Sequence, residues 1–232
     1  MWSLELSAAP RIVDLAESFL SSTELAHARS FRFPWLLRRY VLAHAALRIL
    51  LSGYTGEHHA ALRFVTGPYG KPGLAGPATL HFNLSGSGEF ALLGLSPDCP
   101  VGVDVEQVRP LTHLNSLAHS VLTPAEAAAV LPLPAEEGTR RLFQLWTRKE
   151  ACLKAAGFGL SVEAGTLECL GGRLTWREGA PAVFPLDDLT LYDLEPAPDY
   201  VGACVAGSAQ QRLTRPRLRW MSISASRLLS EW

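Results

Sequence analysis

The first half of the chain carries both helical and extended patterns of apolar residues. A serine lies three residues before a glutamate at 21–24, the pattern of a capping box, which predicts a helix beginning there. A longer helix is predicted for residues 34–51, where apolar side chains recur near helical spacing, and Gly53 is expected to end it. Strands are predicted at 61–66, 80–84 and 90–95, and a loop rich in glycine and proline at 67–73.

The second half opens with a different pattern. Valines alternate with Gly102, Asp104 and Glu106, which predicts a strand with one polar face. A second capping box begins at Thr123, with proline at the first helical position. A long helix is predicted for residues 137–156, ended by Gly157, and the runs 189–194 and 200–205 predict a twisted antiparallel sheet.

Each half therefore combines helices with a few strands, and no low-complexity tract or long linker separates the halves. This indicates an α+β protein with two closely packed subdomains. The boundary is expected near residues 97–101, which gives an N-terminal subdomain at 1–99 and a C-terminal subdomain at 100–232. The sequence repeat between the two halves is too weak to support a claim.

Composition narrows the class of protein. The chain has 232 residues, 48% of them hydrophobic, which is ample for a packed core. Its net charge of -1 argues against a general nucleic-acid binder, for which a basic balance is expected. The seven histidines include no metal-binding spacing, so they are interpreted as structural or solvated.

Location is inferred from what the sequence lacks. The N-terminus has no basic stretch followed by an apolar run, and the most apolar segment, residues 40–51, is too short to cross a bilayer. The four cysteines have no paired spacing, which favours a reducing compartment. We therefore expect a soluble, cytoplasmic protein that does not act at a membrane.

The two acids of the valine-rich strand are the first candidates for chemistry. Asp104 and Glu106 lie two residues apart, so both carboxylates point to the same face of the strand. A solvated polar face is the simpler interpretation of such a pair. The sequence around the pair does not by itself exclude it.

A third acid lies on the predicted long helix. Trp146, Glu150 and Lys154 are spaced at i, i+4 and i+8, so they form one stripe. The simpler alternative is an ordinary i,i+4 salt bridge. If the stripe faces the strand, three carboxylates converge with Lys149 and Lys154 nearby. Carboxylates suit a hard divalent cation, and lysines suit a phosphate ester.

Three blocks of sequence occur in a fixed order. They are Tyr69-Gly70-Lys71-Pro72 followed by Phe82-Asn83-Leu84-Ser85-Gly86-Ser87, then Gly102-Val103-Asp104-Val105-Glu106, and then Trp146-Thr147-Arg148-Lys149-Glu150-Ala151-Cys152-Leu153-Lys154-Ala155-Ala156-Gly157. Together they resemble the Sfp-type 4′-phosphopantetheinyl transferases in motif, order and separation. The similarity covers about residues 21–170.

This resemblance implies a fold and a site. The fold is a pair of α+β subdomains related by a pseudo-twofold axis, with coenzyme A in the cleft between them. Asp104, Glu106 and Glu150 match the acids around a magnesium ion. The expected coenzyme contacts, with Arg38 and Arg48 flanking the first of them, are Arg39, Lys71, Asn83, Ser85, Gly86, Lys149 and Lys154.

The implied reaction is transfer of the phosphopantetheine arm of coenzyme A to a serine of an apo acyl or peptidyl carrier protein, with release of 3′,5′-ADP. Such transfers depend on positioning and charge stabilisation, so Lys154 is a catalytic candidate beside the metal. A carboxylate must take the serine proton, with Glu150 the first candidate and Glu106 the second. The carrier would serve fatty-acid synthesis or secondary metabolism, and the chain length resembles the monomeric branch of the family.

Two departures from the family pattern leave an alternative open. Gly86 stands where the family usually has a histidine that contacts a phosphate of the coenzyme, although a backbone N–H in the 86–88 turn is a possible substitute. Glu24 and His27 stand where the family often has lysines for the 3′-phosphate. The alternative is a catalytically impaired relative that binds carrier proteins without modifying them.

Nucleotide-binding motifs do not offer a better explanation. Residues 86–91 fit GxGxxA, and acids follow about 20 residues later. A crossover between parallel strands needs a dozen or more residues, usually helical, and the glycine and prolines at 94–100 leave no room for one. A GxxxxGK[ST] loop is absent from the sequence.

Overall fold

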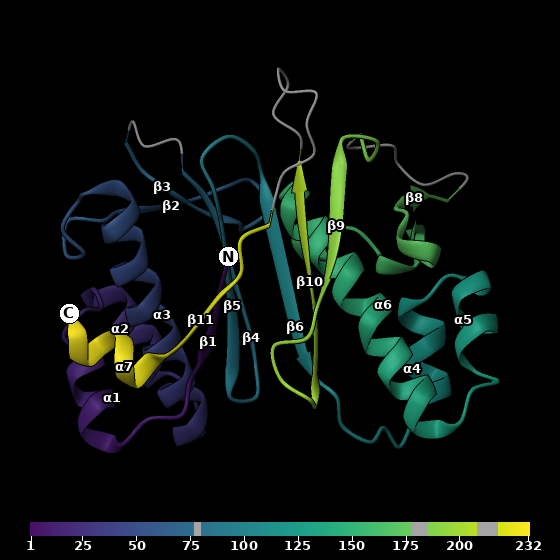
Figure 1. Ribbon diagram of the computed structural model, residues 1–232, viewed down its shortest axis with the longest axis horizontal. Coiled ribbons are helices and arrows are strands. Elements are labelled where there is room, and N and C mark those ends of the chain that lie inside the picture. Colours follow the sequence, from purple (N-terminus) through teal and green to yellow (C-terminus); the bar gives the residue numbers. More distant parts are fainter. Residues whose placement is uncertain (77–79, 178–184, 208–217) are drawn as a thin grey trace.

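The computed structural model describes residues 1–76, 80–177, 185–207 and 218–232, and it is a mixed α+β structure, as expected (Figure 1). The helices are α1 (Pro10–Glu17), α2 (Ser22–Arg29), α3 (Pro34–Thr55), α4 (Leu114–Val121), α5 (Pro124–Val130), α6 (Ala135–Ala156) and α7 (Ala225–Glu231). The strands are β1 (Trp2–Glu5), β2 (Phe64–Thr66), β3 (Pro72–Leu74), β4 (His81–Ser87), β5 (Phe90–Ser96), β6 (Val101–Gln107), β7 (Leu167–Glu168), β8 (Thr175–Trp176), β9 (Leu189–Leu194), β10 (Tyr200–Gly207) and β11 (Met221–Ser224).

Two sheets occupy the middle of the molecule. The first has the strand order β11-β1-β5-β4, and the second has the order β6-β10-β9. All pairings in them are antiparallel except β1 with β11, which is parallel. Helices α1, α2, α3 and α7 lie on one side, and α4, α5 and α6 lie on the other (Figure 1). The antiparallel sheet expected in the second half is therefore present.

The helix limits follow the capping residues, with one exception. Both capping boxes form, because Ser21 and Thr123 each exchange hydrogen bonds with the glutamate three residues later. Gly157 ends α6 in the left-handed region, with φ 83°. The end expected at Gly53 is wrong, since α3 continues to Thr55 and Gly56 takes the left-handed conformation, with φ 73°. A glycine ends a helix only where the chain turns at that residue.

The ends of the chain were not predicted as regular elements. Strand β1 lies between β5 and β11, so the first and last strands of the chain share a sheet. Helix α7 packs on α1 and α3. The strand expected at 61–66 is shorter, because only β2 is extended there. The last strand and helix thus lie with the first half of the chain, on the other side of the division expected at residues 99 and 100.

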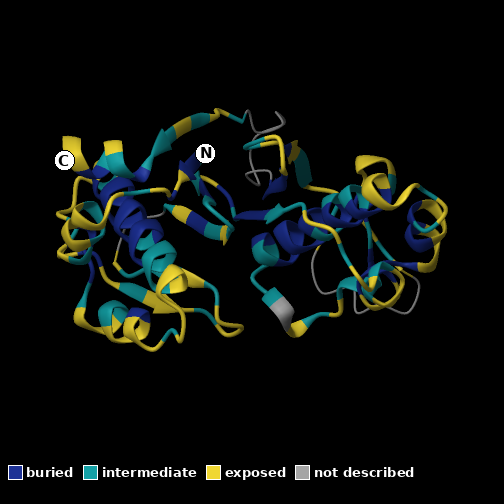
Figure 2. Cartoon of the chain, turned by 90° about the horizontal axis from the view of Figure 1, so that it is seen from below, coloured by how far each residue is buried: buried dark blue, intermediate teal, exposed yellow. Residues whose placement is uncertain are grey.

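Apolar side chains form a core on each side of the sheets and a third cluster between them. One cluster surrounds α3, and another lies between α6 and β10. Leu92 of the first sheet and Val103 of the second belong to the third cluster, which packs the sheets together. Figure 2 shows the buried residues along the long helix on each side. Within the described residues, no helix is long and apolar enough to span a bilayer.

Candidate active site

Side chains of β4 connect the two sheets. Among the described strands, β4 and β6 form no backbone ladder with each other. Asn83, Ser85 and Ser87 alternate along β4, so they share the face that lies against β6. The side-chain oxygen of Asn83 accepts the N–H of Val103 at 2.8 Å, and the hydroxyl of Ser87 accepts the N–H of Gln107 at 3.1 Å. These two contacts fix the position of β6 relative to β4.

The same face of β4 holds the two acids of β6. The hydroxyl of Ser85 donates to Asp104 Oδ1 at 2.8 Å, and the hydroxyl of Ser87 donates to Glu106 Oε2 at 2.7 Å. Asp104 is only 4% exposed, so a solvated polar face is the wrong interpretation for this residue. The acids instead face the junction of the two sheets.

Helix α6 lies directly on the backbone of β6, and Gly102 makes this possible. A Cβ at Gly102 would overlap the carbonyl oxygen of Ala151 and the amide nitrogen of Ala155. Only a residue without a side chain permits this approach. The contact brings the stripe that contains Glu150 and Lys154 against the acids of the strand.

Lys154 extends from α6 to the strand. Its Nζ lies 2.6 Å from Asp104 Oδ1 and 3.2 Å from the hydroxyl of Ser85. The ammonium group therefore pairs with the strand, in contrast to the ordinary helix salt bridge that the spacing also allowed. The second oxygen, Asp104 Oδ2, is buried and has no hydrogen-bond partner in the part of the chain that the structure describes.

Asp104, Glu106 and Glu150, which we call the carboxylate cluster, influence one another electrostatically. Burial raises the pKa of each, and the negative charge of Asp104 raises the pKa of both glutamates further. The ammonium of Lys154 opposes this shift at all three acids. One lysine cannot neutralise three carboxylates, so the cluster has an excess of negative charge that favours a cation.

Glu150 differs from the other two acids in its contacts. Serines hold Asp104 and Glu106, whereas Glu150 has no side-chain hydrogen bond among the described residues. Its side chain is nevertheless mostly buried. A buried carboxylate with a raised pKa and free oxygens is suited to accept a proton.

The described residues contain no set of three His, Cys, Asp or Glu side chains already arranged as ligands of one metal ion. Such an arrangement is typical of zinc and calcium sites. Magnesium is usually held by one or two carboxylates, with waters and substrate phosphates as the remaining ligands. What the carboxylate cluster offers a magnesium ion is therefore its carboxylate chemistry and its free oxygens.

Lys149 does not lie where a coenzyme contact was expected. Its side chain is fully buried and pairs with Glu126, which is equally buried. The ammonium also donates to the carbonyls of Val121 at 2.9 Å and Ala164 at 3.1 Å. Because no part of Lys149 reaches the surface, a coenzyme contact does not fit, and the residue has a structural role in packing α6.

Lys71 lies in the loop between β2 and β3. Its Nζ donates to the carbonyls of Val101 at 2.8 Å and Ala155 at 3.3 Å. The nearby ring of Tyr69 packs against Phe158, with 4.9 Å between ring centroids. Burial lowers the pKa of Lys71 to about 8. The loop thus connects the first half of the chain to the C-terminal end of α6.

Arg38 and Arg39 both bind Glu89 in the turn between β4 and β5. Arg38 Nη2 lies 2.8 Å from both carboxylate oxygens, and Arg39 Nη2 lies 2.8 Å from Glu89 Oε1. The N–H of Glu89 in turn donates to the hydroxyl of Tyr200 at 3.0 Å. These contacts anchor the turn that follows Ser87.

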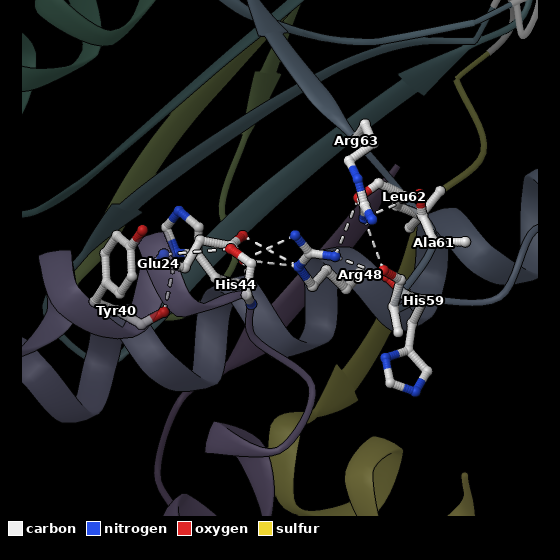
Figure 3. A network of polar contacts seen from close by, with 10 residues as sticks. Glu24, Tyr40, His44, Arg48, His59, Ala61, Leu62 and Arg63 are labelled. Atoms are coloured by element: carbon white, nitrogen blue, oxygen red, sulfur yellow. Dashed lines mark hydrogen bonds and ion pairs between the residues drawn. The ribbon is translucent and has the colours of Figure 1, made fainter.

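Arg48 was expected near the coenzyme region, but it belongs to the interior. It is 3% exposed, pairs with Glu24 at 2.8 Å and donates to the carbonyl of His59 at 2.7 Å. Figure 3 shows this network, with Tyr40 and His44 stacked beside it. Glu24 therefore forms an ion pair with Arg48, and its role is structural.

Gly86 lies on the opposite face of β4 from the two serines and is exposed. A Cβ placed there would lie 3.6 Å from the carbonyl oxygen of Phe90 and 3.7 Å from the Cβ of Ala91, which are ordinary contacts. Its backbone does not have a positive φ. Neither space nor conformation requires glycine at this position, so a larger side chain fits.

Ser87 was missing from the residues expected at the site. It lies at the third position of an alternating polar series on β4, and its partner Glu106 lies on β6. The alternation was visible in the sequence. The sequence did not show which strand lies opposite this series, because β4 and β6 belong to different sheets.

Comparison with known proteins identifies the family of this chain. A family model described as the 4′-phosphopantetheinyl transferase superfamily matches residues 100–197. The 4′-phosphopantetheinyl transferase HetI of Nostoc sp. is 37% identical over 165 residues, which cover 69% of each chain. The chain belongs to the 4′-phosphopantetheinyl transferase superfamily. The family expected from the motifs is thereby confirmed, and with it the expectation of an enzyme.

Two further relatives carry the same enzyme name. The 4′-phosphopantetheinyl transferase psf-1 of Bacillus pumilus is 31% identical over 153 residues, 66% of this chain and 64% of the relative. The 4′-phosphopantetheinyl transferase Sfp of Bacillus subtilis is 28% identical over 145 residues, 62% of this chain and 63% of the relative. The match to these two relatives thus spans somewhat less than two thirds of their length.

Proposed function

We propose that this chain transfers the 4′-phosphopantetheine arm of coenzyme A to a serine of an apo acyl or peptidyl carrier protein and releases 3′,5′-ADP. The observation that carries the proposal is the carboxylate cluster around Asp104, where Lys154 and Ser85 hold one oxygen and the other is buried without a partner. The relatives' names, 4′-phosphopantetheinyl transferases, support transfer of this arm.

The cluster fits a magnesium ion. Its donors are carboxylate oxygens, the ligands that magnesium prefers, and the buried Asp104 Oδ2 needs a partner. We propose that Asp104, Glu106 and Glu150 hold the ion, directly or through waters bound to it. When bound, magnesium would neutralise the charge that develops on the pyrophosphate.

Two residues of α6 have proposed catalytic roles. Lys154 carries an ammonium group beside Asp104, where it can neutralise phosphate oxygens of the donor. Glu150 takes the proton of the attacking serine, because it is the acid without a serine partner and burial raises its pKa. Glu106 is the second candidate, but Ser87 already holds one of its oxygens.

The coenzyme is proposed to lie in a cleft between two pseudo-twofold subdomains, one made of residues 1–99 with β11 and α7, the other of the remaining chain. Lys71 supports this placement, because it brings an ammonium group to the end of α6 that carries Lys154. The proposed contacts, without Lys149, are Arg39, Lys71, Asn83, Ser85, Lys154 and the backbone at Gly86. Four free cysteines are in keeping with a cytoplasmic location, and a monomer is proposed from the family branch.

The reaction is tested by incubating the protein with coenzyme A, magnesium and apo carriers from fatty-acid, polyketide and peptide synthesis. Mass spectrometry should show the added arm on a serine of at least one carrier. No added mass on any carrier would contradict the proposal. Carrier binding without transfer would instead support the catalytically impaired alternative.

Gly86→His distinguishes the two possibilities further. If the chain is an active enzyme, an imidazole at this exposed position should lower the KM for coenzyme A by about tenfold or more, the effect of one added hydrogen bond to a charged group. If the chain is impaired by the missing histidine, the wild type should be inert and the variant should gain transfer. Gly86→Ala, which adds no donor, is the control.

A further inference from the structure

The N-cap residue and the first turn of α3 together expose three large apolar side chains to solvent. Phe33 is 41% exposed, Trp35 48% and Leu36 37%. The rings of Phe33 and Trp35 stack on each other, with centroids 4.5 Å apart and planes 16° from parallel. Scattered exposed apolar residues are normal, but three within four consecutive positions form a patch, which is typical of an interaction site.

Arginines flank the patch in the sequence, and among the described residues Arg32 is the one of them without an acidic partner. Arg29 and Arg32 precede it, Arg38 and Arg39 follow it, and residues 29–40 include no acidic residue. Arg32 is exposed, and its guanidinium lies 5.6 Å from the ring centroid of Phe33. Aromatic side chains with arginines at their rim are enriched at protein interfaces. A complementary surface would be apolar at its centre and acidic at its edge.

The patch lies close to the proposed reaction site along a short series of contacts. One turn further along α3, Arg38 and Arg39 bind Glu89. Glu89 follows Ser87 by two residues, and Ser87 holds Glu106. Figure 1 shows the start of α3 and the turn between β4 and β5 at the same edge of the molecule. A protein bound to the patch would therefore extend toward the carboxylate cluster.

We propose that Phe33, Trp35 and Leu36, with Arg32 at their rim, form the docking surface for the acceptor protein, which presents apolar side chains rimmed by acids. The inference rests on the proposed function, since the second substrate of that reaction is a protein that must hold its serine near Glu150. An anionic membrane would also attract arginines and aromatic rings. The acceptor explains in addition why the patch borders the reaction site.

The test compares two variants with two matched controls. The first variant combines Trp35→Ala with Leu36→Ala, and the second is Arg32→Glu. The controls, Trp232→Ala for the first and Arg173→Glu for the second, change exposed residues elsewhere. Transfer is measured against carrier concentration at saturating coenzyme A, and against coenzyme A at saturating carrier. The variants should lower kcat/KM for the carrier by about tenfold or more, mainly through KM. The KM for coenzyme A and the thermal unfolding of each variant should match the wild type.

Ionic strength provides a second measurement. The wild-type kcat/KM for the carrier should fall as salt rises, and Arg32→Glu should flatten this dependence, because a rim charge acts on association. Wild-type kinetics in both variants would overturn the docking surface and leave the proposed function intact. Loss of binding to phosphatidylserine vesicles, with unchanged carrier kinetics, would assign the patch to a membrane and overturn the proposal as well. A wild type that modifies no carrier would overturn both proposals.

Discussion

Two charged centres lie on different faces of α6, and comparing them separates a structural role from a chemical one. The buried pair, Lys149 with Glu126, is fully buried, and both side chains are satisfied by hydrogen bonds. In the carboxylate cluster, Asp104 retains a buried oxygen without a partner among the described residues, and Glu150 has no side-chain hydrogen bond there.

The two centres differ although Lys149 and Glu150 are adjacent in the sequence. A helix turns by about 100° per residue, so neighbours face different surroundings. A buried polar group that is fully satisfied stabilises one arrangement of the chain, whereas an unsatisfied one is expected where a ligand or a reaction completes it. If the two centres are independent, a substitution in one should leave the other unchanged.

Glu150→Gln should have the largest effect on activity. The amide keeps the size of the side chain but can neither accept the serine proton nor contribute a negative charge. Transfer to the carrier should fall by about a thousandfold, since a general base and a metal ligand are lost together. Unfolding by urea should be unchanged or shifted to slightly higher concentration, because a buried negative charge is removed. Activity close to wild type would exclude Glu150 from the mechanism.

Lys149→Met should instead destabilise the fold. It leaves Glu126 as a buried charge without its partner, which costs about 3 to 5 kcal/mol of unfolding free energy. Urea unfolding measures this loss. Adding Glu126→Gln to the same chain removes the isolated charge and should restore part of the stability. A stable Lys149→Met protein that has lost only coenzyme binding would return Lys149 to the coenzyme site.

Gly102→Ala should affect both centres, since it acts on the contact between β6 and α6. The new methyl group overlaps the helix backbone at Ala151 and Ala155, so the helix must shift. We expect a loss of about 1 to 3 kcal/mol in stability, together with reduced transfer. Val103→Ala, on the other face of the strand, is the control, because it lowers stability without moving α6. Unchanged activity in Gly102→Ala would show that the approach of the helix is not needed.

Lys71→Met tests the connection to the end of α6 through its pH dependence. The pKa of Lys71 is about 8 in the folded protein against an ordinary value of 10.5. Between these values the unfolded chain binds the proton and the folded chain does not, so wild-type stability rises with pH there. Relative to Lys71→Met, the gain should be about 1 to 2 kcal/mol, less than the full shift because the group is partly solvated. Parallel pH curves for the two proteins would contradict the buried position of Lys71.

Much of the fold follows from local sequence. Capping boxes at Ser21 and Thr123 begin helices as predicted, and the alternation at 101–106 predicts β6. Elements defined by distant partners could not be found this way. Strand β1 is short and depends on β5 and β11, which lie about 90 and 220 residues further along the chain. The sequence offers both Gly53 and Gly56 as residues that could end α3. Only the path of the chain after the helix decided that Gly56 ends it.

The sequence by itself determined that Asp104 and Glu106 share a face and that Glu150 and Lys154 share a stripe, because both follow from the geometry of one element. Only the tertiary structure decided that the two faces meet and that Lys154 pairs with Asp104. Only the tertiary structure also showed that Lys149 is buried in the core and that Ser87 donates a hydrogen bond to Glu106. The physical reason is that periodicity fixes directions within an element, whereas close packing at Gly102 fixes which elements touch.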